Sequence, residues 1–342
     1  MPELDLVRAF APEVSGPSTE AYNAARAALL AHMDAQTRPP RRRWTRSLIA
    51  AGAAACGIVL VTALVGLPAI RGEETASAAS VALRHAAEVA REQPPPPPLQ
   101  PGQFAYTKSV NAYLSTTVET NAASAYSVLV PHVREIWLAP DGTGWLRETS
   151  GEPTFLSARD RERWIAAGRP SVGDETTELR LENADASGYA SSAPMDSLGA
   201  PMVSLTLPTD PDVLYRHLER KAAGHGSGLH EQMFTLVGDA LRETSATPAQ
   251  RAALYEVAAR IPGVELVGPV SDRAGRAGIA VAMRDEANRI RHTLIFDPET
   301  SALLGEEEIV LAGNAWDYPE GTVIGFATYL ESAVVDAITE RP

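Results

Sequence analysis

The pattern of hydrophobic and polar positions divides the chain into distinct parts. Residues 48–70 form an unbroken run of 23 residues without a charge. Beyond it, segments with alternating apolar positions indicate strands, a middle section with apolar residues three or four apart indicates helices, and the last 80 residues alternate again. The pattern therefore predicts one membrane span and one mixed domain.

The uncharged run predicts a transmembrane helix over 47–71. At 1.5 Å per residue it would be roughly 34 Å long, enough to cross a hydrocarbon core of about 30 Å. Arginines gather before it and acidic residues follow it, so the positive-inside rule places the N-terminus in the cytoplasm. The arginines that set this orientation are Arg38, Arg41, Arg42, Arg43 and Arg46. We expect a single-pass cell-membrane protein whose C-terminal domain is extracytoplasmic.

A cleaved export signal is the alternative to this anchor. Ala76-Ser77-Ala78 has the small-x-small form of a cleavage site, and Arg42-Arg43 is similar to a twin-arginine pair. The 46 residues before the span and its 23 uncharged residues are both longer than such signals have, which favours the uncleaved anchor.

The charge balance bears on the partner. From Arg71 onward there are 23 basic and 38 acidic residues, and the whole chain has a net charge of −13. Phosphate binding needs clustered positive charge, so this acidic part argues against nucleic acid as a partner. The flank of a membrane span already explains the arginine cluster. The single Cys56 lies within the span, so the outer domain has no disulfide.

The cytoplasmic tail, 1–46, carries one amphipathic stripe. Ser18 is placed to cap a helix, and Tyr22, Ala25, Leu29 and Met33 follow at helical spacing. Two interpretations stay open: a helix lying on lipid beside the span, or a docking face for a cytoplasmic partner.

The residues after the span predict a linker and then a domain. In the linker, 72–102, Ser80 to Arg91 predicts a short helix, and Pro94 to Pro98 predicts a stiff spacer. This spacer either stands the domain off the membrane or separates the helix from the sheet. In the domain, 103–342, two strand-like segments flank Asp141-Gly142 as a hairpin, and the polar stretch 171–200 predicts a long loop.

Helices are expected in the middle of this domain. Pro211, Gly228 and Thr247 each mark a helix start, and Thr247 to Gln250 has the spacing of a capping box. The strands that follow have no helix between them, which predicts antiparallel pairing. The expected fold class is α+β: a single transmembrane helix followed by an extracytoplasmic antiparallel curved sheet, similar to a half-barrel, with crossing helices.

The same pattern predicts the core of the domain. Leu254, Val257 and Ile261 should fill the space between the helices and the sheet. The sheet residues expected to face the helices are Ile290, Leu294, Phe296, Ile324 and Phe326.

Residues that carry chemistry form no specific constellation. His230-Glu231 begins like a zinc-protease helix, but Phe234 stands where the second histidine is needed. Ser227 lies in a glycine-rich loop that lacks the pattern of a serine elbow, which favours a flexible helix entry. Glu306, Glu307 and Glu308 are interpreted as a solvated strand edge.

Aromatic residues give no clearer signal. Trp137, Trp145 and Trp164 either line a ligand cavity or, as is more usual for aromatics on strands, form ordinary core. We therefore predict no catalytic, cofactor-binding or metal-binding residues and no cofactor, and we expect that the protein is not an enzyme.

Three stretches carry a family resemblance: ELDLVRAFAPEVSGPS with its ARAALL helix, ALYEVAARIPGVELVGPVSDRAGRAGIAVA, and LIFDPETSALLGEEEIVL. The chain resembles an actinobacterial family of single-pass membrane proteins that are often encoded beside an extracytoplasmic-function-type sigma factor. The resemblance implies a transmembrane regulator of that factor and brings no catalytic residues. The tail lacks the His/Cys zinc motif that many anti-sigma factors carry. The order of elements in the outer domain is also similar to the half-barrel of periplasmic lipoprotein carriers and of sigma-regulating sensor domains.

Two functions follow as expectations. The first is a membrane-anchored, non-enzymatic sensor or binding protein, which contacts the bilayer through 48–70, a sigma factor through its tail, and an apolar ligand or cell-envelope protein outside. The alternative is a membrane-tethered carrier of a lipid or other apolar ligand; an extracytoplasmic enzyme ranks third. The lining and volume of a cavity between sheet and helices distinguish the first two.

Overall fold

A single antiparallel sheet organises the domain. The computed structural model describes residues 72–117, 125–172, 176–181, 207–242 and 246–342. The sheet has ten strands in the order β5-β4-β3-β1-β10-β9-β8-β7-β6, with β2 paired to β1 outside this path. The strands are β1 (Phe104–Thr117), β2 (Tyr126–Leu129), β3 (His132–Leu138), β4 (Gly144–Ser150), β5 (Thr176–Leu181), β6 (Glu265–Ser271), β7 (Ala277–Asp285), β8 (Ile290–Phe296), β9 (Leu303–Val310) and β10 (Val323–Val335).

Most strand pairs join neighbours in the sequence, as the turn signals predicted. The hairpin around Asp141-Gly142 is confirmed, with Trp137 opposite Trp145 in the register of β3 and β4. The one long-range pairing joins β1 to β10 and so connects the two halves of the sheet. Bulges interrupt this pairing at Lys108/Ser109 and the β8–β9 pairing at Ile295/Phe296, and such bulges bend and twist a sheet. The expected curved antiparallel sheet is confirmed.

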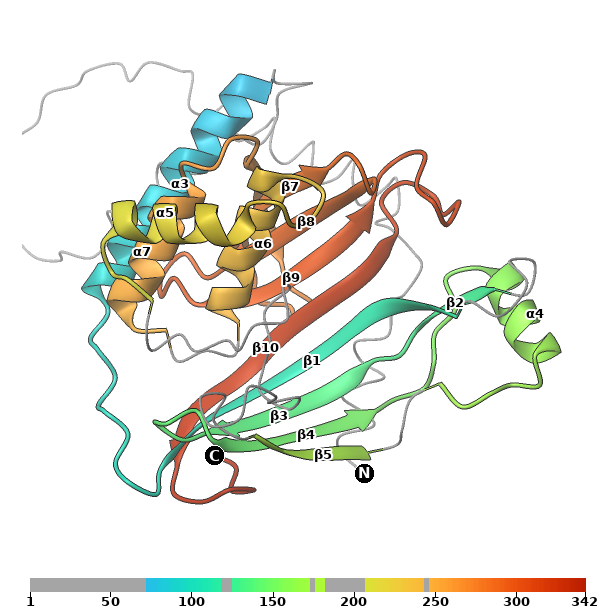
Figure 1. The fold of residues 1–342 in the computed structure, drawn as a ribbon, viewed down its shortest axis with the longest axis horizontal. Helices are drawn as coiled ribbons and strands as arrows, with labels where there is room; N and C mark the ends of the chain where they lie inside the picture. The colour runs from blue at the N-terminus through green and yellow to red at the C-terminus, as the bar shows by residue number, and fades with distance from the viewer. Residues whose placement is uncertain (1–71, 118–124, 173–175, 182–206, 243–245) are drawn as a thin grey trace, which may run out of the picture. The chain divides into compact units, whose positions relative to one another are not determined.

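Helices cover only one end of this sheet (Figure 1). They are α3 (Gly72–Glu92), α5 (Pro211–Ala222), α6 (Leu229–Leu241) and α7 (Pro248–Ala258), while α4 (Ala158–Ala166) lies beside β2. α3 packs against α7 and β6, and α6 contacts β7. The polyproline segment Pro94–Pro98 therefore connects a helix and a strand of the same body.

Local signals fixed the helix starts. The Asp210 side chain caps α5, with Pro211 in the first turn. At α7 the full capping box forms, because the Thr247 side chain accepts from the Gln250 backbone and the Gln250 side chain accepts from the Thr247 backbone. These contacts satisfy backbone N–H groups that have no partner inside the helix. The helices expected here are confirmed.

Two boundaries differ from the prediction. The helix expected from Ser80 begins already at Gly72. Within the polar stretch expected to be a loop, Thr176–Leu181 forms a strand that pairs with β4. Four of the six residues of β5 are exposed, so its composition lacked the apolar alternation that identifies a strand.

The predicted core is confirmed on the helix side. Leu254 and Val257 are fully buried, and Ile261 is 4% exposed. Leu294 lies against α6, and the ring of Phe296 lies 5.3 Å from the ring of Tyr255 on α7.

The prediction was wrong for Phe326, whereas Ile290 shares a face of β8 with Leu294. Phe326 packs with Val110 and Val133, on the sheet face turned away from the helices. Ile290 and Ile324 belong to a cluster of strand and loop residues around Tyr318. Alternation identified residues that share a face, but it did not say which face the helices cover.

Part of the sequence analysis concerns residues outside the described ones. The tail with Tyr22, Ala25, Leu29 and Met33, the arginine cluster Arg38 to Arg46, and the predicted span all lie outside them. Within the described ranges, no helix combines the length and the apolar character that crossing a membrane requires.

Candidate functional site

A polar cluster lies where α6 meets the middle of the sheet. α6 approaches closely because Gly238 has no side chain: a Cβ there would lie 3.2 Å from a methyl carbon of Leu294. Gly325 on β10 leaves room for two other side chains of the cluster. A Cβ at this position would lie 2.8 Å from the Tyr113 ring and 2.9 Å from a Glu308 oxygen. These two glycines make room for the charged side chains between helix and sheet.

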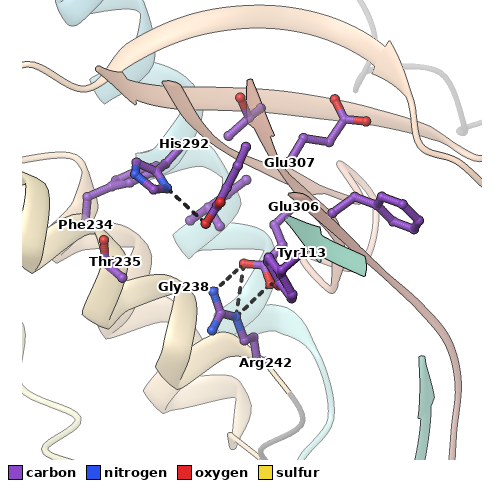
Figure 2. Close-up of a pocket in the computed structure, with 12 residues that line it drawn as sticks. Tyr113, Phe234, Thr235, Gly238, Arg242, His292, Glu306 and Glu307 are labelled. Atoms are coloured by element: carbon purple, nitrogen blue, oxygen red, sulfur yellow. Dashed lines mark hydrogen bonds and ion pairs between the residues drawn. The ribbon is translucent and has the colours of Figure 1, made fainter. Parts of the chain in front are cut away.

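The three consecutive acids of β9 supply two members of this cluster. They were interpreted as a solvated edge, which is wrong: β9 lies between β8 and β10, and Glu306 is only 7% exposed. Figure 2 shows Glu306 on the helix side and Glu307 pointing away from it. Because successive strand residues point to opposite faces, Glu308 shares the side of Glu306. Glu307 instead pairs with Arg273 at 3.1 Å on the other face, where Arg273 stacks on Phe326.

Glu306 is the centre of the cluster. Arg242, directly after α6, donates from Nε and Nη2 to one carboxylate oxygen at 3.0 and 2.8 Å. The hydroxyls of Tyr113 and Tyr329 donate to the other oxygen at 2.8 and 3.3 Å. Arg242 also donates to Asp239 at 2.7 Å. The buried carboxylate thus has strong donors on both oxygens (Figure 2).

The protonation of this network follows from its burial. Burial raises the pKa of the Tyr113 hydroxyl well above its usual value, and the Glu306 carboxylate raises it further. Burial alone would lower the pKa of Arg242, but Glu306, Tyr329, Tyr113 and Asp239 together outweigh that effect, and the pKa lies above its usual value. Tyr113 therefore remains a neutral donor and Arg242 a cation at any physiological pH. The network is a fixed structural contact rather than a proton relay.

Glu308 and His292 form the less constrained part of the cluster. His292 Nδ1 lies 3.7 Å from Glu308 Oε1, and both side chains are partly exposed. Burial raises the pKa of Glu308, His292 counteracts this, and the nearby Glu306 charge raises it again. Glu308 is thus the carboxyl here whose charge is least favoured in the folded protein.

The cavity beside these residues is small, and its lining mixes polar and apolar side chains. Its volume is about 40 Å³. A single water needs roughly 10–15 Å³, and ligand pockets usually measure about 300–1,000 Å³. The residues that line it are Tyr113, Phe234, Thr235, Gly238, Arg242, His292, Thr293, Leu294, Glu306, Glu307, Glu308 and Phe326. The cavity has room for a few waters and none for an acyl chain.

The cluster offers little catalytic chemistry. A general base or a nucleophile needs a group that can reach a substrate, but Glu306 already accepts from an arginine and two tyrosines. Across the described ranges, no three His, Cys, Asp or Glu side chains come close enough together to hold a metal ion. The arrangement fastens α6 to the sheet.

Other residues considered in the sequence have structural surroundings. Ser227 donates to Asp285 at 2.6 Å, which fixes the loop before α6. Trp137 is fully buried in the core, and Trp145 packs against the same cluster. Trp164 contacts Phe155 and donates to the Pro170 carbonyl at 3.0 Å. The interpretation of these tryptophans as core is confirmed.

The cluster around Glu306 was missed in the sequence because Arg242, Tyr113, Tyr329 and Glu306 lie in or beside four separate elements. Tyr113 and Glu306 are 193 residues apart, and Arg242 and Glu306 are 64 apart. The available signal was the alternation within Glu306 to Glu308, which already places two of the acids on one face. Only the position of β9 inside the sheet shows that this face is buried.

No protein-family model matches the sequence, and no curated protein matches it. Two solved structures are similar at 14% identity over 77% of this chain. One is the complex structure of Pseudomonas aeruginosa MucA/MucB, with 59% of that chain covered and a TM-score of 0.28. The other is the crystal structure of MucB in complex with MucA(peri), with 57% covered and a TM-score of 0.26. The chain thus spans under three fifths of the solved chains it matches, and both likenesses are too distant to carry a functional assignment.

Proposed function

We propose that this protein is a membrane-anchored, non-enzymatic binding protein whose extracytoplasmic domain recognises a protein partner and whose tail acts on a cytoplasmic sigma factor. The observation that carries the proposal is the closed interface under α6. There, fully buried apolar residues of α7 and the Arg242–Glu306 contact fill the space that a ligand would need. Recognition is therefore left to the surface of the domain.

The carrier alternative receives no support from this interface. A pocket that buries an acyl chain gains about 0.8 kcal/mol per methylene only where its walls are apolar. The cavity beside Glu306 measures about 40 Å³, far below the roughly 300–1,000 Å³ of ligand pockets, and charged side chains form part of its lining. Within the described part of the chain, this interface is packed rather than open.

The cytoplasmic half of the proposal rests on the sequence. The positive-inside rule gives the orientation, and the stripe of Tyr22, Ala25, Leu29 and Met33 gives the apolar face that a partner would cover. The family resemblance implies the partner class: a sigma factor of the extracytoplasmic-function type that is often encoded beside members of that family.

Capture of that sigma factor by the full-length protein tests the proposal. The wild type should retain it on an affinity column, and Leu29→Asp should abolish capture because it places an unpaired charge on the apolar face. Ala31→Asp is the matched control, since two residues further along a helix it adds the same charge to the opposite face. Failure of the wild type to capture the factor, or equal loss in both variants, would contradict the docking face.

A further inference from the structure

The seven residues after β10 form a strap across β1 and β3. This C-terminal strap is residues 336–342, all of them exposed. Gln103 donates to Asp336 at 2.8 Å, the Trp137 indole donates to the Glu340 carbonyl at 2.7 Å, and Arg341 donates to both Glu135 oxygens at 2.5 and 2.7 Å. The strap is thus fastened mainly by polar contacts.

The site that receives Arg341 is built into the sheet. We call Tyr106, Glu135 and Trp137 the guanidinium site. The Glu135 side chain is 3% exposed, and the Tyr106 hydroxyl donates to it at 2.9 Å. Tyr106 and Trp137 are fully buried, with their rings 5.2 Å apart. A rigid, buried carboxylate that accepts both bonds in parallel suits the planar guanidinium of arginine better than the point charge of lysine.

One residue of the strap has a strained backbone conformation. Thr339, one residue before Glu340, has φ 73°. This left-handed conformation is a genuine outlier for a β-branched residue and costs about 1–3 kcal/mol. The strap also buries little apolar surface, since Ile338 remains 37% exposed. Release of the strap would relieve the strain and lose few hydrophobic contacts.

Release would, however, leave Glu135 without its hydrogen-bonded guanidinium, and Lys108, opposite it on β1, would be the cation that remains nearby. A buried carboxylate that loses its charged partner is strongly destabilising, whereas exchange of one guanidinium for another preserves the pair. The strap is therefore displaced readily only by a segment whose own arginine replaces Arg341 at Glu135. The strap shows the backbone that fits beside it: a turn in which the Glu340 N–H donates to the Ala337 carbonyl at 3.2 Å, while the Glu340 carbonyl accepts from the Trp137 indole.

From these contacts we propose that the guanidinium site binds an arginine-bearing, turn-forming segment of a partner protein, and that the C-terminal strap occupies the site as an intramolecular competitor. Because a tethered segment acts at an effective concentration in the millimolar range, the strap sets a threshold that a partner must exceed. The proposal concerns the extracytoplasmic face and is independent of sigma-factor capture by the tail.

A peptide with the strap sequence, DAITERP, is the probe, labelled and titrated into the full-length protein. Arg341→Ala should bind it at least ten-fold more tightly than the wild type, because the tethered competitor has lost its guanidinium. The peptide with alanine in place of arginine should not bind either protein. Arg289→Ala, which removes an exposed arginine paired with Glu286, is the matched control and should behave like the wild type.

Two further variants keep the result interpretable. Adding Glu135→Gln to Arg341→Ala should remove peptide binding again, with circular dichroism confirming that the sheet is folded. Thr339→Asn keeps Arg341 and tolerates the left-handed conformation, so the strap should compete better and peptide affinity should fall below that of the wild type. Equal affinity of Arg341→Ala and the wild type, or equal binding of both peptides, would overturn the proposal.

Discussion

The two halves of the sheet are stabilised in different ways. Strands β6 to β9 have helices packed on them, and their core includes fully buried side chains such as Leu254. Strands β1 to β5 depend more on contacts along the sheet itself, such as the Tyr106–Trp137 rings and the Lys108–Glu331 ion pair, and on the strap. This second half also has apolar clusters, such as Val110, Leu129 and Val133, but replaceable polar contacts of the strap cover Glu135. A binding site is therefore expected at Glu135.

A glutamate in each half shows the same difference: Glu308, which is partly exposed, and Glu135, which is buried. Burial raises the pKa of Glu308 beside α6, and the neighbouring Glu306 charge adds to this. Burial would also raise the pKa of Glu135, but hydrogen bonds from Arg341 and Tyr106 outweigh it and hold the pKa below its usual value. The charge of Glu135 is therefore stabilised in the folded protein, and the charge of Glu308 is not.

The largest expected effect is in the helix-covered half. Leu254→Ala should lower the free energy of unfolding by about 2–5 kcal/mol, because it leaves a cavity among fully buried neighbours. Leu179→Ala on the edge strand β5 is the matched control: its side chain is 38% exposed, and the loss should stay below about 1 kcal/mol. Denaturant unfolding measures both. A near-neutral Leu254→Ala would indicate an open cavity and revive the carrier hypothesis.

The contact between α6 and the sheet comes next. Arg242→Ala leaves Glu306, whose side chain is 9% exposed, without its cation. Because the arginine side chain is itself 30% exposed, solvent screening reduces the loss to about 2–3 kcal/mol. Glu306→Gln in the same background removes the unpaired charge and should recover part of the stability in a double-mutant cycle. Additive effects of the two substitutions would contradict a direct pair.

The smallest expected effect is that of pH on Glu308. Its folded-state pKa is raised, so the folded protein binds this proton more tightly than the unfolded chain and loses stability as pH rises from the unfolded pKa through the folded one. Glu308→Gln removes this loss. Unfolding free energies between pH 4 and pH 7 should therefore shift in favour of the variant as pH increases, by less than about 1 kcal/mol. A difference that does not change with pH, or that changes the other way, would show that the Glu308 charge is not disfavoured.

Local sequence determined much of this fold. The capping box at Thr247, the proline after Asp210 and the turn at Asp141-Gly142 involve residues at most a few positions apart, so they act before any tertiary contact forms. Apolar alternation likewise identified the antiparallel strands of the last 80 residues. These signals suffice for the fold class because each is satisfied within one helix or one hairpin.

Tertiary structure alone decided the sites. Alternation with period two places Glu306 and Glu308 on one face, but only the insertion of β9 between β8 and β10 buries that face, and only the approach of α6 supplies Arg242. The same holds for Glu135, whose partner Arg341 is 206 residues away. From the sequence alone, a glutamate is expected to be a solvated surface residue. A carboxylate can be buried only where the fold brings a cation to it, and here that cation is distant in the sequence.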